Sequence, residues 1–185
     1  MKGVAEAFDV PLAVTLLDHA QAVYRSADDF EAWALAGSDG AHILSFRSTQ
    51  VGITYSATRI VIAARGSSQF GDWGENILAL RVPWRRYFPE GLVHLGFVLQ
   101  ARRVATKLVR LLRAVRAKYP GAPIYIAGHS LGGALALLLR RILDVEGIPV
   151  RATYTFEGPR VGNTAFAAWF DRWYGRDTFR VVAIR

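Results

Sequence analysis

Cysteine is absent from the 185 residues. This absence excludes disulfide scaffolds, zinc sites built on thiolates, and cysteine nucleophiles. It leaves the compartment open, because a chain of this length can bury a core without disulfides. Proline is scarce as well, at seven residues, and the 17 glycines follow no Gly-X-Y period. Collagen-like and low-complexity segments are therefore excluded, and we expect one domain spanning residues 1–185 with no cofactor and no metal.

Long apolar runs are also missing. The most apolar long stretch, 124–139, contains His129 and Ser130 and is shorter than the roughly 20 apolar residues that span a bilayer. Near the N-terminus, Glu6 and Asp9 interrupt the apolar run that a signal peptide would need. We therefore expect a soluble protein, cytoplasmic by default.

Acidic residues are fewer than basic ones, 15 against 23, which gives a net charge of +8. Much of the excess lies between residues 102 and 118. Helical spacing predicts a buried stripe in this segment, formed by Val104, Leu108, Leu111 and Val115. Arg103, Lys107 and Arg110 occupy a different, solvated face.

The basic face has a second interpretation, which is attraction to anionic lipid or nucleic acid. No RNP, zinc-finger or glycine-rich phosphate motif accompanies the charge, so we expect no specific nucleic-acid partner.

The order of the predicted elements indicates the fold class. The first half is expected to hold helices over 12–25 and after a cap at Asp28, strands over 41–47, 51–56 and 59–65, an irregular segment over 67–89, and the basic helix, which ends near Tyr119. The second half alternates: strand 123–127, helix 130–145, strand 150–156, helix 163–174 and strand 178–184. Such alternation requires crossover connections, so we predict an α/β fold whose mixed, mostly parallel sheet is flanked by helices.

The segment Gly128-His129-Ser130-Leu131-Gly132 is a Gly-x-Ser-x-Gly motif. A predicted strand leads into it and an Ala/Leu-rich helix leaves it, which is the context of a nucleophile elbow. In such a tight turn the two glycines are needed where a Cβ would clash. The hydroxyl of Ser130 would then be exposed at the carboxyl end of the strand, and the N–H of Leu131 would be the first donor of an oxyanion hole. The alternative is an ordinary strand-to-helix turn with an incidental serine.

A second donor is expected from the loop after the strand that ends at Arg65. Ser67 is well placed in that loop to give its N–H to the oxyanion hole. The segment that follows carries four large apolar side chains, Phe70, Trp73, Ile77 and Leu78. Two interpretations stay open: these residues form a lid over an apolar pocket, or they belong to a core helix.

Four ordered motifs resemble the fungal-type class 3 lipases, an α/β-hydrolase family. They are 65–68 (Arg-Gly-Ser-Ser) with Asp72-Trp73, 93–97 (Val-His-Leu-Gly-Phe), 126–136 (Ile-Ala-Gly-His-Ser-Leu-Gly-Gly-Ala-Leu-Ala), and 155–163 (Thr-Phe-Glu-Gly-Pro-Arg-Val-Gly-Asn). The resemblance implies a lipase or esterase that acts on lipid esters, with a possible lipid–water interface as its place of action. It also implies that Ser130 is the nucleophile, that Ser67 and Leu131 form the oxyanion hole, and that 70–80 corresponds to the lid. Glu157 stands where the family usually has glycine, a departure that concerns the shape of that loop.

The resemblance is incomplete at the catalytic base, because the family's triad runs Ser, Asp, His along the chain and no histidine follows His129. His129 is expected to point away from the nucleophile, and His94 to be a packing histidine. The other two histidines, and the acids near the last strand, are expected to lie in unsuitable places. These are His19, His42, Asp171 and Asp177.

Without a base, Ser130 is an ordinary alcohol. We therefore expect either a C-terminally incomplete hydrolase or a natural relative that no longer catalyses, and poor esterase activity from residues 1–185. The alternative class is a non-catalytic basic module that binds a lipid surface or nucleic acid. A salt-dependent binding assay would distinguish it.

Overall fold

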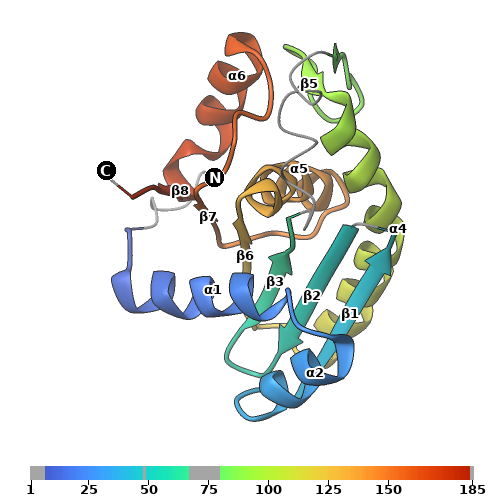
Figure 1. Cartoon of the computed structure of the whole chain (residues 1–185), viewed down its shortest axis with the longest axis vertical. Helices are drawn as coiled ribbons and strands as arrows, with labels where there is room; N and C mark the ends of the chain where they lie inside the picture. The colour runs from blue at the N-terminus through green and yellow to red at the C-terminus, as the bar shows by residue number, and fades with distance from the viewer. Residues whose placement is uncertain (1–6, 48, 67–79, 184–185) are drawn as a thin grey trace.

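The computed structural model describes residues 7–47, 49–66 and 80–183. Its centre is a six-stranded sheet flanked by helices (Figure 1). In the order in which they lie across the sheet, the strands are β1 (Gly40–Phe46), β2 (Thr49–Tyr55), β3 (Ile60–Ala64), β6 (Ile124–His129), β7 (Ala152–Phe156) and β8 (Thr178–Val181). The first three pair antiparallel, and from β3 to β8 the neighbours are parallel. The predicted mixed, mostly parallel α/β sheet is confirmed.

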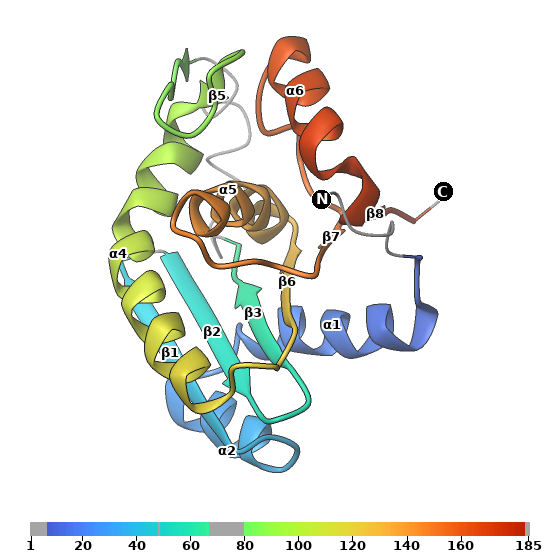
Figure 2. The same ribbon diagram turned by 180° about the vertical axis from the view of Figure 1, so that it is seen from behind.

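Helices cover both faces of the sheet, as the two opposite views in Figures 1 and 2 show. One face carries α1 (Val10–Ala22) and α2 (Ala27–Leu35), and the other carries α4 (Leu95–Lys118) and α5 (Leu131–Val145). The chain continues beyond β7 through α6 (Thr164–Tyr174) and the 3-10 turn η1 (Gly175–Asp177).

Alternation along β3 explains this three-layer arrangement. Ile60 and Ile62 belong to the core shared with α4 and α5, whereas Val61 and Ala63 lie among the side chains of α1 and α2. All five residues of β3 are buried. A strand with helices on both faces needs apolar residues at successive positions, because side chains alternate between the two faces.

The basic helix α4 ends at Lys118, with Tyr119 as its C-cap, as predicted. Its charged residues Arg103, Lys107 and Arg110 are exposed. The predicted stripe is partly wrong, because Leu111 is only half-buried while Leu112 is buried. The reason is that α4 packs against both the sheet and α5, so its buried face is wider than a single i, i+4, i+7 row.

Two local expectations need correction. Ser26, not Asp28, caps α2, and its hydroxyl accepts a hydrogen bond from the N–H of Asp29 at 3.2 Å. Asp28 lies inside the first turn, where its charge favours the positive end of the helix dipole. The expected irregular segment over 67–89 contains β4 (Arg81–Val82), which pairs antiparallel with β5 (Val93–His94).

Residues 67–79 lie outside the described part of the chain. Among the described residues, no helix combines the length and apolarity that a transmembrane span requires.

Candidate active site

Ser130 lies in the turn between the end of β6 and the start of α5. Its backbone has φ 55° and ψ −126°, a region that non-glycine residues rarely adopt. Such strain persists only where the surrounding structure enforces it, and it is typical of functional sites. The backbone around Ser130 is held by two 2.8 Å hydrogen bonds: its N–H donates to the carbonyl of Phe156, and its own carbonyl accepts from Gly133.

The two glycines of the motif make this turn sterically possible. A Cβ on Gly128 would lie 2.1 Å from the carbonyl oxygen of Gly132, and a Cβ on Gly132 would lie 2.0 Å from the carbonyl oxygen of Ala64. Both distances are far below van der Waals contact, and the opposing atoms belong to backbone. Strand β6, helix α5 and the end of β3 therefore meet here at backbone distance.

The position of Ser130 also places it beside free backbone donors. The first N–H groups of an α-helix have no partner within the helix, and Leu131 is the first residue of α5. The positive end of the helix dipole adds to this, so an oxyanion next to Ser130 would be stabilised. The side chain of Ser130 makes no capping hydrogen bond to the helix, which leaves its hydroxyl available to a substrate.

The loop after β3 lies directly against the elbow. A Cβ on Gly66 would lie 3.3 Å from both the carbonyl oxygen of His129 and the Cβ of Leu131. The N–H of Gly66 donates to the phenol oxygen of Tyr24 at 3.0 Å. The ring of Tyr24 in turn lies 6.4 Å from that of His129 and 5.4 Å from the guanidinium of Arg65. Burial raises the pKa of Tyr24, so its hydroxyl stays neutral.

Sequence reasoning did not find Tyr24 as part of this site. The contact joins residues 42 positions apart, and no periodicity or motif around Tyr24 indicates it.

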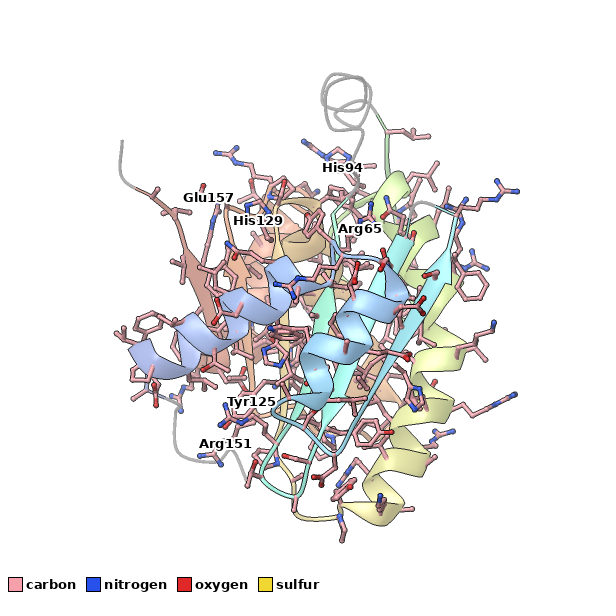
Figure 3. The ribbon with its side chains drawn as sticks, turned by 60° about the horizontal axis from the view of Figure 1, so that its bottom comes forward. Arg65, His94, Tyr125, His129, Arg151 and Glu157 are labelled. Carbon is pink, nitrogen blue, oxygen red and sulfur yellow. The ribbon has the colours of Figure 1, made fainter. Side chains whose placement is uncertain are left out.

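Glu157 follows β7 at the same end of the sheet as His129 (Figure 3). Its φ of 51° lies in the left-handed region, where glycine is free of strain. This is the physical reason for a glycine at this point in the family pattern. Here the strained loop is fixed by hydrogen bonds, since the N–H of Glu157 donates to Val181 at 3.0 Å and its carboxylate accepts from the N–H of Ala183.

The four histidines all lie in the described part of the chain, and none forms a hydrogen bond to Ser130 there. His19 binds the carbonyl of Thr15 at 2.7 Å and the hydroxyl of Thr54 at 3.1 Å. His42 lies on β1, the edge strand, which is three strands away from β6. Its ring contacts the Tyr55 hydroxyl at 3.2 Å.

The remaining two histidines are His94 and His129. His94 is 2 % exposed, with its ring 5.4 Å from that of Phe97. His129 directs its ring toward Tyr24, as described above.

The two acids considered near the last strand lie at its amino end. Asp171 belongs to α6 and Asp177 to η1, both of which precede β8. Asp177 forms an ion pair of 2.8 Å with Arg140, far along the sheet from Ser130.

Two further expectations, the second donor of the oxyanion hole and the apolar lid, have no structural outcome. Ser67 and the apolar residues Phe70, Trp73, Ile77 and Leu78 lie outside the described residues. Within the described residues, no three His, Asp or Glu side chains gather as a metal site would require.

Comparisons with known proteins agree with this geometry. The sequence model of the family "Lipase (class 3)" matches residues 61–185. The secreted mono- and diacylglycerol lipase A of Penicillium cyclopium is 31 % identical over 120 residues, which are 64 % of this chain and 39 % of the relative. The secreted mono- and diacylglycerol lipase 1 of Fusarium solani is 32 % identical over 140 residues, 72 % of this chain and 41 % of the relative. The chain thus spans about two fifths of the length of these relatives.

Solved structures show the same fold. The lipase from Rhizopus microsporus var. chinensis superposes with a TM-score of 0.76 at 21 % identity, over 97 % of this chain and 70 % of that one. A triacylglycerol lipase described as having a serine protease triad as its catalytic centre gives a TM-score of 0.77 at 24 % identity, over 96 % and 72 % of the two chains. Two of the relatives above are named as secreted proteins, so the cytoplasmic expectation has no support from them.

Proposed function

The chain belongs to the class 3 lipase family, and on that premise we propose that it carries the nucleophile and oxyanion hole of a carboxylic ester hydrolase. The observation that carries this proposal is the strained backbone of Ser130 between β6 and α5. This turn is sterically possible because positions 128 and 132 are glycine. An incidental serine in an ordinary turn would not need such a conformation.

In the proposed reaction, Ser130 Oγ attacks the carbonyl carbon of the ester. The new Oγ–C bond forms while the carbonyl oxygen becomes an oxyanion, which accepts hydrogen bonds from the N–H groups of Leu131 and Ser67. The alcohol leaves with a proton and an acyl-enzyme remains. Water then attacks the acyl carbon, which releases the carboxylic acid and restores the serine.

The substrate that we propose is an acylglycerol, with the active site acting at a lipid–water interface. The names of the Penicillium and Fusarium relatives support this choice, since both are mono- and diacylglycerol lipases. Phe70, Trp73, Ile77 and Leu78 are proposed to line the entrance as an apolar lid, because acyl chains need an apolar surface to bind. By the same comparison, we propose that the place of action is outside the cell.

The proton of Ser130 needs an acceptor, and none of the four histidines is bonded to the hydroxyl. Removal of triad members still leaves an acceleration of about 10³ to 10⁴ over water in serine hydrolases. We therefore expect the 185-residue chain by itself to hydrolyse esters only at a trace rate.

Covalent labelling tests the nucleophile independently of turnover. An alkyl fluorophosphonate transfers its phosphonyl group to a serine oxygen as the P–F bond breaks and fluoride leaves. After long incubation, peptide mass spectrometry should find the label on Ser130, with protection by a diacylglycerol emulsion. Ser45, which is exposed on β1, is the internal control and should stay unlabelled. Equal labelling of Ser130 and Ser45 would refute the proposal. Labelling of Ser130 that the diacylglycerol emulsion does not reduce would refute it as well.

A further inference from the structure

A groove lies on the side of α5 that carries Arg140 and Arg141. It has a volume of about 930 Å³ and is bordered by the segment before β6, the segment before β7 and the turn before β8. Six arginines line it, which are Arg116, Arg140, Arg141, Arg151, Arg172 and Arg176. We call it the arginine groove.

The arginine groove is distant from the candidate active site. Its three bordering segments all precede parallel strands, whereas Ser130 follows one. The six residues of β6 separate the two ends by roughly 20 Å, at about 3.3 Å per residue. Figure 3 shows Arg151 at the opposite end of the sheet from His129 and Glu157. The groove is therefore not a part of the ester-binding site.

The acidic residues of the groove are already engaged. The lining contains two carboxylates against the six arginines. Asp144 forms a 2.7 Å ion pair with Arg141, and Asp177 a 2.8 Å pair with Arg140. With both carboxylates paired, the lining holds no further carboxylate for Arg116, Arg172 and Arg176.

Two of the other arginines have no partner at all in the described part of the chain. Arg116 and Arg176 form neither a hydrogen bond nor an ion pair there. Arg172 pairs with Glu90 at 3.4 Å, but both side chains are more than half exposed, and such exposed pairs are weak.

Aromatic rings hold part of this cluster in place. The guanidinium of Arg140 lies 5.0 Å from the ring centre of Tyr174, and that of Arg141 lies 5.2 Å from the ring centre of Trp169. Both contacts are of cation–π type. Trp173, 57 % exposed, borders the same groove. These contacts hold the guanidinium groups of Arg140 and Arg141 in place within the groove.

We propose that the arginine groove binds a small soluble anion that carries two or more phosphate groups. Guanidinium groups match phosphate in geometry and charge, and several unneutralised arginines favour an anion with several charges. The volume also matches the roughly 300 to 1,000 Å³ of small-molecule sites. This proposal stands independently of the ester hydrolase activity.

Calorimetric titration with tripolyphosphate tests the site. The double variant Arg116→Gln/Arg176→Gln removes the two unpartnered guanidinium groups. Arg102→Gln/Arg103→Gln is the matched control, because it removes the same charge from exposed positions on α4, roughly 20 Å from Arg116 at about 1.5 Å per helical residue. Circular dichroism and urea midpoints check that all three proteins are folded.

Tripolyphosphate should bind the unaltered chain, and orthophosphate should bind more weakly. The groove variant should lose at least about tenfold in affinity, as expected for the loss of charge-assisted contacts, and the control should stay within about twofold. Added salt should weaken binding. Absence of binding at millimolar tripolyphosphate would overturn the proposal, and so would an equal loss in the control. Binding to anionic vesicles or to DNA that tripolyphosphate does not displace would also overturn it, in favour of a macromolecular partner.

Discussion

The hydroxyl of Tyr24 accepts a hydrogen bond from the N–H of Gly66 at 3.0 Å. Tyr24 follows helix α1, and Gly66 is two residues beyond the end of β3. The bond thus ties the N-terminal helix to the loop that leads into Ser67. Since Gly66 also lies next to Leu131, Tyr24 positions the loop for the proposed oxyanion hole.

Replacement of Tyr24 by phenylalanine should destabilise the protein. The N–H of Gly66, which is buried, would lose its partner, at a cost of about 1 to 2 kcal/mol. Urea unfolding measures this change. Tyr125→Phe is the matched control, because the Tyr125 hydroxyl makes no hydrogen bond within the described residues, and its unfolding free energy should change by less than about 0.5 kcal/mol. Equal effects of the two substitutions would show that the bond does not hold the loop.

The backbone contacts at the elbow predict a strong contrast among glycines. Gly128→Ala or Gly132→Ala would force a Cβ to within 2.1 Å of backbone atoms. We expect a loss of about 3 kcal/mol or more in unfolding free energy, or failure to fold. Gly96→Ala is the control, since a Cβ there meets nothing within 4 Å. It lies in α4, where alanine should stabilise by up to about 1 kcal/mol. Tolerance of alanine at position 128 would contradict the close contact.

Stability should fall in mildly acidic solution because of His19. Burial lowers the pKa of His19, its bond to Thr15 and the charge of Asp18 oppose this, and Arg59 adds to it. A lowered pKa in the folded state means that the unfolded chain binds a proton more readily. The stability that His19 contributes is therefore fully present above its pKa of about 6.5 in the unfolded chain, and it is lost as pH falls below that value.

Urea unfolding at pH 7.5 and at pH 5.5 measures this dependence. His19→Gln should lose less stability than the unaltered chain between the two values. His42→Gln, at an exposed position, should behave like the unaltered chain. An identical loss in all three proteins would rule out His19 as the cause.

The sequence predicts much of the architecture because apolar periodicity reports burial. The two-faced burial of β3 and the alternation after Tyr119 give the parallel sheet and the place of Ser130 in it. Apolar periodicity does not show which of several neighbouring polar residues caps a helix. For this reason the sequence predicts Asp28 as the cap of α2, although Ser26 is the cap. Periodicity also does not show how wide the buried face of α4 is, since that width depends on where α5 packs.

Contacts between distant segments are the other limit. Tyr24 meets Gly66 only after α1 has packed on the sheet, and no local pattern encodes that contact. The arginine groove likewise assembles from α4, α5, α6 and three strand connections, so that its six arginines read as scattered surface charges in the sequence. The strained φ of Glu157 could have been inferred, since the family pattern has glycine there.

Chemical rescue tests the assignment of Ser130 most directly. The measurement is hydrolysis of p-nitrophenyl butyrate by the 185-residue chain and by Ser130→Ala, each with and without added imidazole. We predict a trace rate without imidazole, because none of the four histidines is bonded to Ser130. With imidazole we predict a higher rate that exceeds the rate of Ser130→Ala, since the added base takes the proton of the serine. An imidazole-dependent rate that is identical in the two proteins would show that Ser130 is not the nucleophile. Rapid hydrolysis without imidazole that Ser130→Ala abolishes would show that one of the four histidines is the base.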